Sequence, residues 1–264
     1  MLLLLAHHHD AEARWLQQML DQVYHLRMAY LVPEALGLDY NITLRLNNHG
    51  QPSATVAFNK AAWKLESNEV SYAINRLSYV DPIIWRKAQP SELTYAASEL
   101  NAFFPALIAS LPCPVSNRIY HGALYGDVNF AARWAARVDE CGLSFDSSFI
   151  DDPSSSYQKL SAINPTELHR FMFDGEEILT PPDQATLPRE NEIRECFINQ
   201  GEDETLEAIF MNESGTPRLL YLSKTPSLSC YGALYLDSLA QRLVKHKYDP
   251  AHRHSQRTAV AAAG

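Results

Sequence analysis

Three consecutive histidines and an aspartate, His7-His8-His9-Asp10, directly follow an apolar run, Leu2–Ala6. Ligands commonly bind at the carboxyl ends of strands in open α/β sheets, and imidazole is a common metal ligand. The histidines could therefore hold a metal ion or a phosphate. Consecutive residues on an extended backbone point in different directions, however, so three of them cannot easily reach one ion. We favour a polar loop in which Asp10 caps the next helix.

An Asn-Arg pair occurs twice, as Asn75-Arg76 and as Asn117-Arg118, each at the end of an expected strand. If the two strands are neighbours, both pairs face one crevice and suit an anionic ligand. The alternative, which we favour, is that the asparagines satisfy turn backbone and the arginines pair with surface carboxylates.

Standard catalytic motifs are absent from the sequence. It contains no GxGxxG after the first strand and no GxxxxGK[ST], GxSxG or HExxH. Ser227, Ser229 and Cys230 lie in a Pro/Ser-rich stretch without an evident His–acid partner, so we interpret them as loop or core residues. Lys224 follows an expected strand and could face a cleft, although a solvated lysine is the favoured interpretation.

Composition narrows the classes of function. The length of 264 residues suits one large domain or two small ones, and the net charge of -9 argues against a general nucleic-acid binder. Four widely spaced cysteines indicate reduced thiols rather than a disulfide framework. The apolar start is shorter than the ~7–15 residues of a signal-peptide core, and no run approaches the ~20 residues of a membrane span. We therefore expect a cytoplasmic protein with neither a nucleic-acid nor a membrane partner.

The elements that must position these residues alternate between strand and helix in the first half. Leu2–Ala6 predicts a strand buried on both faces, and a helix follows Asp10. The expected order then continues with a hairpin of Tyr40–Leu46 and Ser53–Phe58, strand Val70–Ile74, helix Ser91–Leu111 with a kink or break at Pro105, strand Pro114–Ser116 and helix Asp127–Cys141. This alternation predicts an α/β fold with a parallel sheet.

The composition changes at Asp151, after which hairpins dominate. His169–Phe173 pairs with Glu176–Leu179. A longer loop, Asn212–Pro217, joins the strands of a second hairpin, and a final helix covers Tyr235–His246. We predict a parallel-sheet domain over 1–150, a smaller α+β domain over 151–248 and a disordered tail over 249–264.

These pieces together resemble the ATP-grasp superfamily of carboxylate–amine ligases, in its RimK-like and peptide-modifying (graspetide-type) branch. The likeness rests on three segments. The first is the first strand with Asp10-Ala11-Glu12-Ala13. The second is the run of Asn75-Arg76-Leu77, Trp85, Glu99, Val115-Ser116-Asn117, Arg133-Trp134-Ala135 and Cys141-Gly142-Leu143. The third is His169–Glu176, similar to an R-V-x-V-x-G-D hairpin, together with Ile209–Leu222, Pro226 and the closing helix. The resemblance implies a pre-ATP-grasp-like first domain and a truncated ATP-grasp-like second domain.

The chain also departs from that family. Between Leu143 and Arg170 the family places lysine-bearing strands and a glycine-rich loop that hold nucleotide phosphates, whereas here Lys159 is the only lysine. The family's last strand carries E-x-N as magnesium ligands, where this chain has Leu222-Ser223-Lys224-Thr225-Pro226. A lysine cannot replace an oxygen ligand of Mg²⁺, and phosphoryl transfer without lysines and magnesium loses its main stabilisation.

The leading hypothesis is therefore a degenerate ATP-grasp-like protein without a cofactor. It would act as a non-catalytic binding or accessory subunit, with a peptide or protein partner, in peptide modification. One alternative is an active ATP-dependent carboxylate–amine ligase in which Lys159, Arg170 or Lys224 contacts the phosphates of ATP. Glu207, Glu213 or Asp174 would then hold magnesium.

A second alternative is a metal-dependent enzyme that uses His7, His8 and His9. The oligomeric state also stays undecided, and a homodimer is one alternative, because a set of four aromatic side chains could belong either to the core or to a dimer surface. The residues of that set are Tyr120, Tyr125, Phe130 and Trp134.

Overall fold

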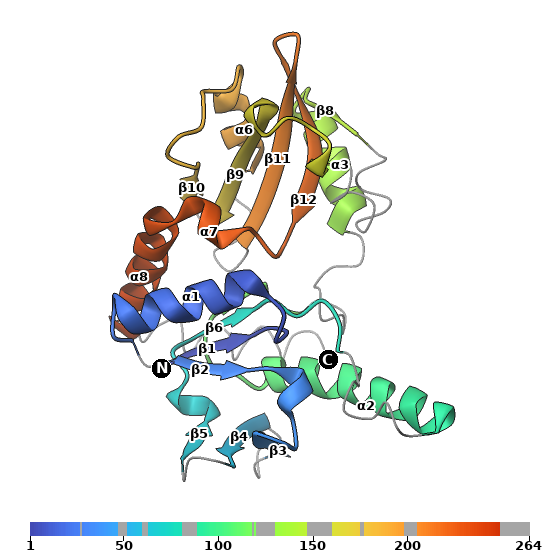
Figure 1. Cartoon of the computed structure of the whole chain (residues 1–264), viewed down its shortest axis with the longest axis vertical. Coiled ribbons are helices and arrows are strands. Elements are labelled where there is room, and N and C mark those ends of the chain that lie inside the picture. The colour runs from blue at the N-terminus through green and yellow to red at the C-terminus, as the bar shows by residue number, and fades with distance from the viewer. Residues whose placement is uncertain are drawn as a thin grey trace. The chain divides into compact units, whose positions relative to one another are not determined.

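A computed structural model describes most of the chain. The described residues are 1–26, 28–46, 52–59, 63–80, 89–117, 119, 130–146, 160–174, 177–197 and 205–248. The chain divides by its contacts into two compact units, one of Met1–Gly126 with Leu239–Gly264 and the other of Asp127–Ser238 (Figure 1). The boundaries predicted at residues 150 and 248 rest on composition, a different criterion, and stay a prediction.

The first unit is built on a four-stranded parallel sheet. Its strand order is β2 (Met28–Leu31), β1 (Leu2–Leu5), β6 (Tyr72–Asn75) and β7 (Val115–Ser116), and each neighbouring pair is parallel. All four leucines of β1 are buried, as a strand flanked on both sides requires. The predicted central strand and parallel sheet are confirmed.

Helices follow the strands of this sheet. α1 (Ala11–Gln22) begins where Oδ1 of Asp10 accepts a hydrogen bond from the amide of Ala13 at 3.0 Å, which confirms the predicted cap. α2 (Pro90–Ala109) is one helix that includes Pro105, so no break occurs there. Its buried side chains, among them Phe104 and Leu107, hold the helix to the core on both sides of the proline.

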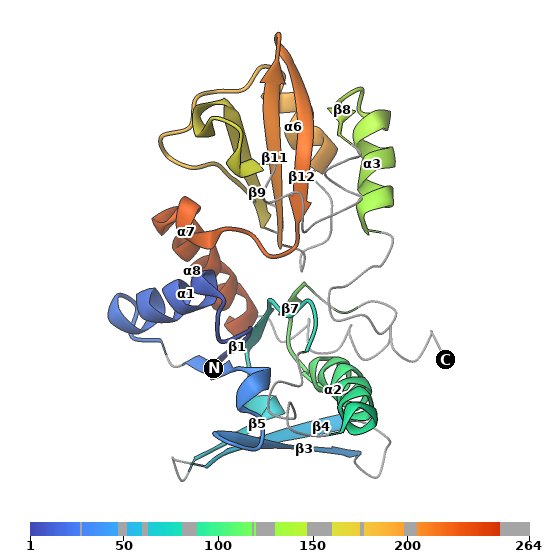
Figure 2. The same cartoon turned by 45° about the vertical axis from the view of Figure 1, so that its right-hand side comes forward.

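A three-stranded antiparallel sheet completes the first unit (Figure 2). It consists of β3 (Tyr40–Leu46), β4 (Pro52–Phe58) and β5 (Lys64–Glu66), in that order. The predicted hairpin of β3 and β4 is confirmed. Tyr40 and Val56 from this sheet share one apolar cluster with Leu3 and Leu5 of β1. Two short 3-10 helices, η1 (Pro33–Ala35) and η2 (Ser67–Glu69), follow β2 and β5.

The second unit has a five-stranded sheet. Its order is β10 (Glu177–Leu179), β9 (Leu168–Asp174), β11 (Thr205–Glu213), β12 (Thr216–Ser223) and β8 (Ser144–Phe145), and all pairs are antiparallel except β12 with β8. Both predicted hairpins are confirmed. The long loop predicted over Asn212–Pro217 is wrong, because only Ser214 and Gly215 lie outside the strands. Both have positive φ, at 53° and 89°, which suits a tight two-residue hairpin turn.

The helices of the second unit are α3 (Phe130–Glu140), α6 (Glu190–Phe197) and α7 (Leu228–Tyr231), with the 3-10 helix η4 (Pro165–Glu167) before β9. α3 and α6 contribute to an aromatic core. The ring of Phe197 stacks between Trp134 and Phe173, with centroids 4.3 Å from each. Trp134 is therefore a core residue. α8 (Ala233–Tyr248), predicted over Tyr235–His246, crosses the boundary between the two units in sequence.

Several predicted features lie outside the described residues. They include Arg118, Tyr120, Tyr125, Lys159 and the tail 249–264. Within the described part of the chain, no helix is both long enough and apolar enough to cross a lipid bilayer.

Candidate functional site

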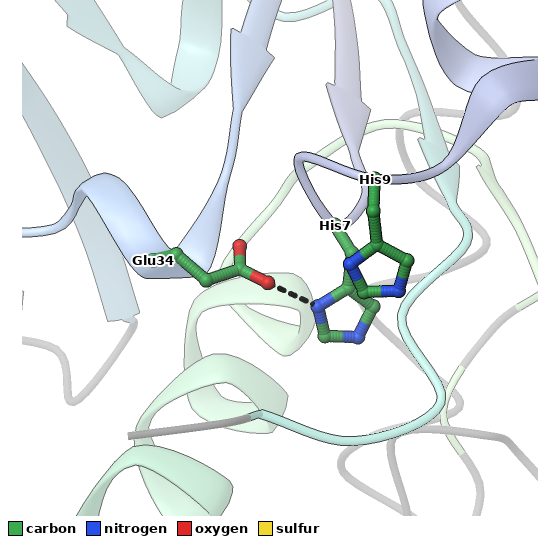
Figure 3. A group of neighbouring side chains, drawn as sticks. All are labelled: His7, His9 and Glu34. Atoms are coloured by element: carbon green, nitrogen blue, oxygen red, sulfur yellow. Dashed lines mark hydrogen bonds and ion pairs between the residues drawn. The ribbon is translucent and has the colours of Figure 1, made fainter. Parts of the chain in front are cut away.

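The histidine-rich loop lies at the carboxyl end of β1 and contains a buried hydrogen bond between two side chains. His7 places its Nδ1 2.7 Å from Oε1 of Glu34, and both side chains are less than 10% exposed, at 6% and 9% (Figure 3). Glu34 comes from η1, immediately after β2, and β2 is the parallel neighbour of β1. The two residues are therefore brought together by the ends of adjacent strands.

The loop turns rather than continuing as an extended chain. The amide of Asp10 donates to the carbonyl of His7 at 3.0 Å, and this turn stacks the His7 and His9 rings with centroids 5.2 Å apart. Ligand atoms of His7, His9 and Glu34 all lie within 4.8 Å of one another. The extended geometry assumed from the sequence, which set the three histidines apart, is wrong for His7 and His9. His8 is 61% exposed, with its Nδ1 3.6 Å from Oε1 of Glu34.

The electrostatics of this loop favour an ionised Glu34. Burial alone would raise the pKa of Glu34, but the hydrogen bond from His7 and the positive potential of His7 and His8 hold it below its ordinary value. The sequence analysis missed Glu34 because it did not predict strand β2. The signal was present in Met28–Leu31, a short apolar run that ends directly before Val32-Pro33-Glu34.

Arg76 lies at the end of β6 and binds Asp10. Its Nε donates to Oδ2 of Asp10 at 2.8 Å, and the arginine side chain is only 5% exposed. Burial alone would raise the pKa of Asp10, but the charge and hydrogen bond of Arg76 hold it below the ordinary value. Arg76 thus pairs with a partly buried helix cap, not with the surface carboxylate that the favoured interpretation expected.

The two asparagines at the ends of β6 and β7 bind each other's backbone. Nδ2 of Asn75 donates to the carbonyl of Asn117, and Nδ2 of Asn117 donates to the carbonyl of Asn75, each at 3.1 Å. Oδ1 of Asn75 also accepts from the amide of Leu77. These contacts agree with the turn-satisfying interpretation. An anion-binding role for Asn75, Arg76 and Asn117 stays a prediction.

In the second unit, the buried residue Glu207 receives four hydrogen bonds. Its Oε1 accepts from Nη1 of Arg170 at 3.1 Å and from the Tyr231 hydroxyl at 3.2 Å. Its Oε2 accepts from the amide and hydroxyl of Ser227, at 3.1 and 3.3 Å. Burial and the nearby Glu207 raise the pKa of Tyr231. Burial alone would lower the pKa of Arg170, but Glu207 raises it.

The other two acidic candidates of the second unit are also bound by protein groups. Asp174 is buried, and its two carboxylate oxygens accept from Thr205 at 2.9 Å and from Ser238 at 3.0 Å. Glu213 is exposed and pairs with Arg218 at 3.0 Å. Lys224 is 2% exposed, so the expectation of a solvated lysine is wrong. It directly follows Ser223, whose β12 backbone pairs with Glu207 on β11.

No protein-family model matches the sequence, and no curated protein is detectably similar to it. Solved structures do match the fold. The macrocyclase MdnC from Microcystis aeruginosa MRC, bound with precursor peptide MdnA, is 13% identical. The match covers 92% of this chain and 99% of MdnC, with a TM-score of 0.63.

Two further structures match over most of their length. A RiPP-associated ATP-grasp ligase of Chryseobacterium gregarium, in complex with ADP and a leader and core peptide, is 9% identical, with coverage of 90% and 91% and a TM-score of 0.58. The ATP-grasp ligase PsnB, complexed with minimal precursor, Mg and ADP, is 10% identical, with coverage of 91% and 97% and a TM-score of 0.55. The chain therefore has the fold of the ATP-grasp ligases that the resemblance implied.

Proposed function

We propose that this protein is a non-catalytic ATP-grasp-like subunit that binds a peptide in a peptide-modification system. The observation that carries the proposal is the environment of Glu207, the buried acidic residue beside the end of β12. Among the residues that the structure describes, Arg170, Tyr231 and Ser227 donate four hydrogen bonds to its two carboxylate oxygens. One of them, Arg170, already supplies the positive charge that a metal ion would otherwise provide.

This arrangement opposes magnesium binding on physical grounds. Mg²⁺ requires nearly octahedral oxygen ligands at about 2.0–2.1 Å and loses its waters reluctantly. To bind at Glu207, it would have to displace Arg170 or Ser227 and then tolerate the freed guanidinium nearby. The guanidinium of Arg170, 3.1 Å from the carboxylate, would also repel the metal ion. Without magnesium, the charge that develops during phosphoryl transfer lacks its usual stabilisation.

The peptide partner is proposed from the structural neighbours. MdnC, the Chryseobacterium gregarium ligase and PsnB are each described in complex with a precursor or a leader and core peptide. A protein of the same fold that lost nucleotide chemistry could keep peptide binding as its remaining role. Such a subunit would present or position a peptide for a separate catalyst.

An active ligase is the competing function, and the ADP and Mg described for PsnB favour it. The deciding experiment is calorimetric titration of the whole chain with ATP and Mg²⁺, together with an assay for ADP release when peptide and amine substrates are added. We expect neither heat of binding nor ADP. Bound nucleotide at about 100 times its Kd would add about 2.7 kcal/mol of stability, so thermal unfolding provides a second readout.

Matched variants make a positive result interpretable. If ATP binds through the rearranged site of the ligase alternative, Arg170→Met should weaken binding strongly. Arg218→Met should not, because Arg218 lies on the same sheet but pairs with Asp146 and Glu213 at a more exposed position. ATP turnover that depends on Arg170 would contradict the proposed non-catalytic role.

A further inference from the structure

We propose that His7, His9 and Glu34 form a binding site for one divalent transition-metal ion, with zinc as the preferred ion. The proposal concerns the first unit and does not depend on the function proposed above. The three residues offer ligand atoms that all lie within 4.8 Å of one another, so small side-chain rotations bring them around a single ion (Figure 3).

The donor set selects the class of metal. Two imidazoles and one carboxylate are ligands that zinc accepts, and a His₂Glu set with one open position is an established zinc arrangement. Magnesium and calcium prefer oxygen ligands only, so this site discriminates against them.

Two buried atoms at the site have no hydrogen-bond partner among the residues that the structure describes. They are Nε2 of His7 and Oε2 of Glu34. A buried polar atom without a partner costs about 1–3 kcal/mol, so such atoms call for an explanation. Both side chains are more than nine-tenths buried. Each of these atoms can serve as a metal ligand.

The backbone around the ligands is fixed before any ion binds. The carbonyl of His7 accepts from the hydroxyl of Tyr30 at 2.9 Å and from the amide of Asp10 at 3.0 Å. At the carboxyl end of the neighbouring strand β2, the Tyr40 hydroxyl donates to the carbonyl of Val32 at 2.7 Å, two residues before Glu34. Such outer contacts orient ligands and reduce the entropic cost of binding. The ring of Tyr79 contacts His7, with centroids 4.5 Å apart.

The test is titration of the chelator-treated full chain with Zn²⁺ by calorimetry, with Co²⁺ as a spectroscopic probe. We expect one ion per chain, visible Co²⁺ bands of a low-coordinate nitrogen and oxygen site, and a higher melting temperature. His9→Ala and Glu34→Gln should each weaken Zn²⁺ binding by on the order of 100-fold, at the upper end of losses seen even for outer contacts. Mg²⁺ should produce no shift.

A matched control distinguishes this site from non-specific Zn²⁺ binding by other histidines, because the chain has ten in all. His25 is exposed, lies outside the cluster and has a positive φ of 48°. His25→Asn keeps a residue that tolerates this backbone and should leave Zn²⁺ affinity unchanged. His9 is also exposed, so His9→Ala should keep the metal-free melting temperature. The proposal is overturned if no stoichiometric ion binds, or if affinity is the same in His9→Ala, Glu34→Gln and the native chain.

Discussion

Arg170 and Glu207 form an ion pair along the diagonal of two antiparallel strands. Arg170 on β9 stands opposite Ile209, and Glu207 on β11 stands opposite Met172, so the two side chains share one face of the sheet. Nη1 of Arg170 lies 3.1 Å from Oε1 of Glu207. Long side chains reach each other at this diagonal spacing. The pair therefore ties the neighbouring strands β9 and β11 together.

Neutralising Glu207 should destabilise the second unit. Glu207→Gln keeps the shape of the side chain but removes its charge, which leaves Arg170 without its counter-ion. Breaking a buried pair costs about 3–5 kcal/mol, and we expect about 3 kcal/mol because Arg170 is partly exposed. Urea unfolding at neutral pH measures this loss.

Glu213→Gln is the matched control on the same strand. Glu213 pairs with Arg218, but both side chains are more than a third exposed, at 46% and 34% respectively. Exposed pairs contribute about 0–1 kcal/mol. Equal losses for Glu207→Gln and Glu213→Gln would show that the Arg170–Glu207 pair has no special structural role.

The stability of the first unit should depend on the ionisation of Asp10. Its pKa in the folded protein is below the ordinary value of 3.8. Its ion pair with Arg76 therefore stabilises the folded state above the unfolded-state pKa, and this stabilisation disappears as pH falls through the folded-state pKa. Asp10→Asn keeps a good helix cap but removes the carboxylate that pairs with the buried guanidinium of Arg76. We expect a loss of about 3 kcal/mol at neutral pH.

The pH dependence distinguishes the ion pair from a general effect of substitution. The difference in unfolding free energy between native protein and Asp10→Asn should shrink toward zero in acid, where Asp10 is protonated in both states. Urea unfolding at several pH values provides the measurement. Asp21→Asn, an exposed position in the same helix, should show no such trend. A difference that persists unchanged in acid would mean that the ion pair is not its cause.

Sequence patterns predicted the elements whose apolar residues follow a clear period. β1, α1 and the hairpins β3–β4, β9–β10 and β11–β12 all carry such signals. The elements that were missed are short. β2 has four residues, β8 has two, and α6 has eight, of which only Ile193, Cys196 and Phe197 are buried. Packing of the whole unit, rather than local preference, decides the conformation of such segments.

The candidate sites depend on register and on sheet order, which local patterns do not contain. His7 and Glu34 are 27 residues apart and meet only because β1 and β2 are parallel neighbours. Arg170 and Glu207 meet because β9 pairs with β11 in one particular register. The sequence supplied Arg170, Glu207 and the histidines as candidates, but it gave no basis for joining them.

Removing the central ring of the aromatic stack should destabilise the second unit more than any exposed substitution. Phe197 is 1% exposed and stacks on both Trp134 and Phe173. Phe197→Ala should cost about 3–5 kcal/mol, because the cavity cannot fully close and two aromatic contacts are lost. Phe197→Leu fills most of the space and should cost clearly less. Similar losses for both variants in thermal unfolding would indicate that the surrounding core rearranges freely.

Two substitutions of Asn117, at the end of β7, should separate the stability cost of backbone strain from that of a lost hydrogen bond. Its φ is 57°, a left-handed conformation that asparagine and glycine tolerate better than alanine. Its side chain also donates to the carbonyl of Asn75 in a buried position. Asn117→Gly removes the side-chain hydrogen bond without straining the backbone, at a cost of about 1–3 kcal/mol. Asn117→Ala loses the bond and adds about 1–2 kcal/mol of strain.

The order of stability in urea unfolding should therefore be native protein, then Asn117→Gly, then Asn117→Ala. Glycine also makes the unfolded chain more flexible, which reduces the gap between the two variants by roughly 0.4–1 kcal/mol. If Asn117→Ala is as stable as Asn117→Gly, the backbone at residue 117 relaxes out of the left-handed region. The reciprocal bond from Asn75 to the carbonyl of Asn117 should then lengthen as well, because it depends on the same turn.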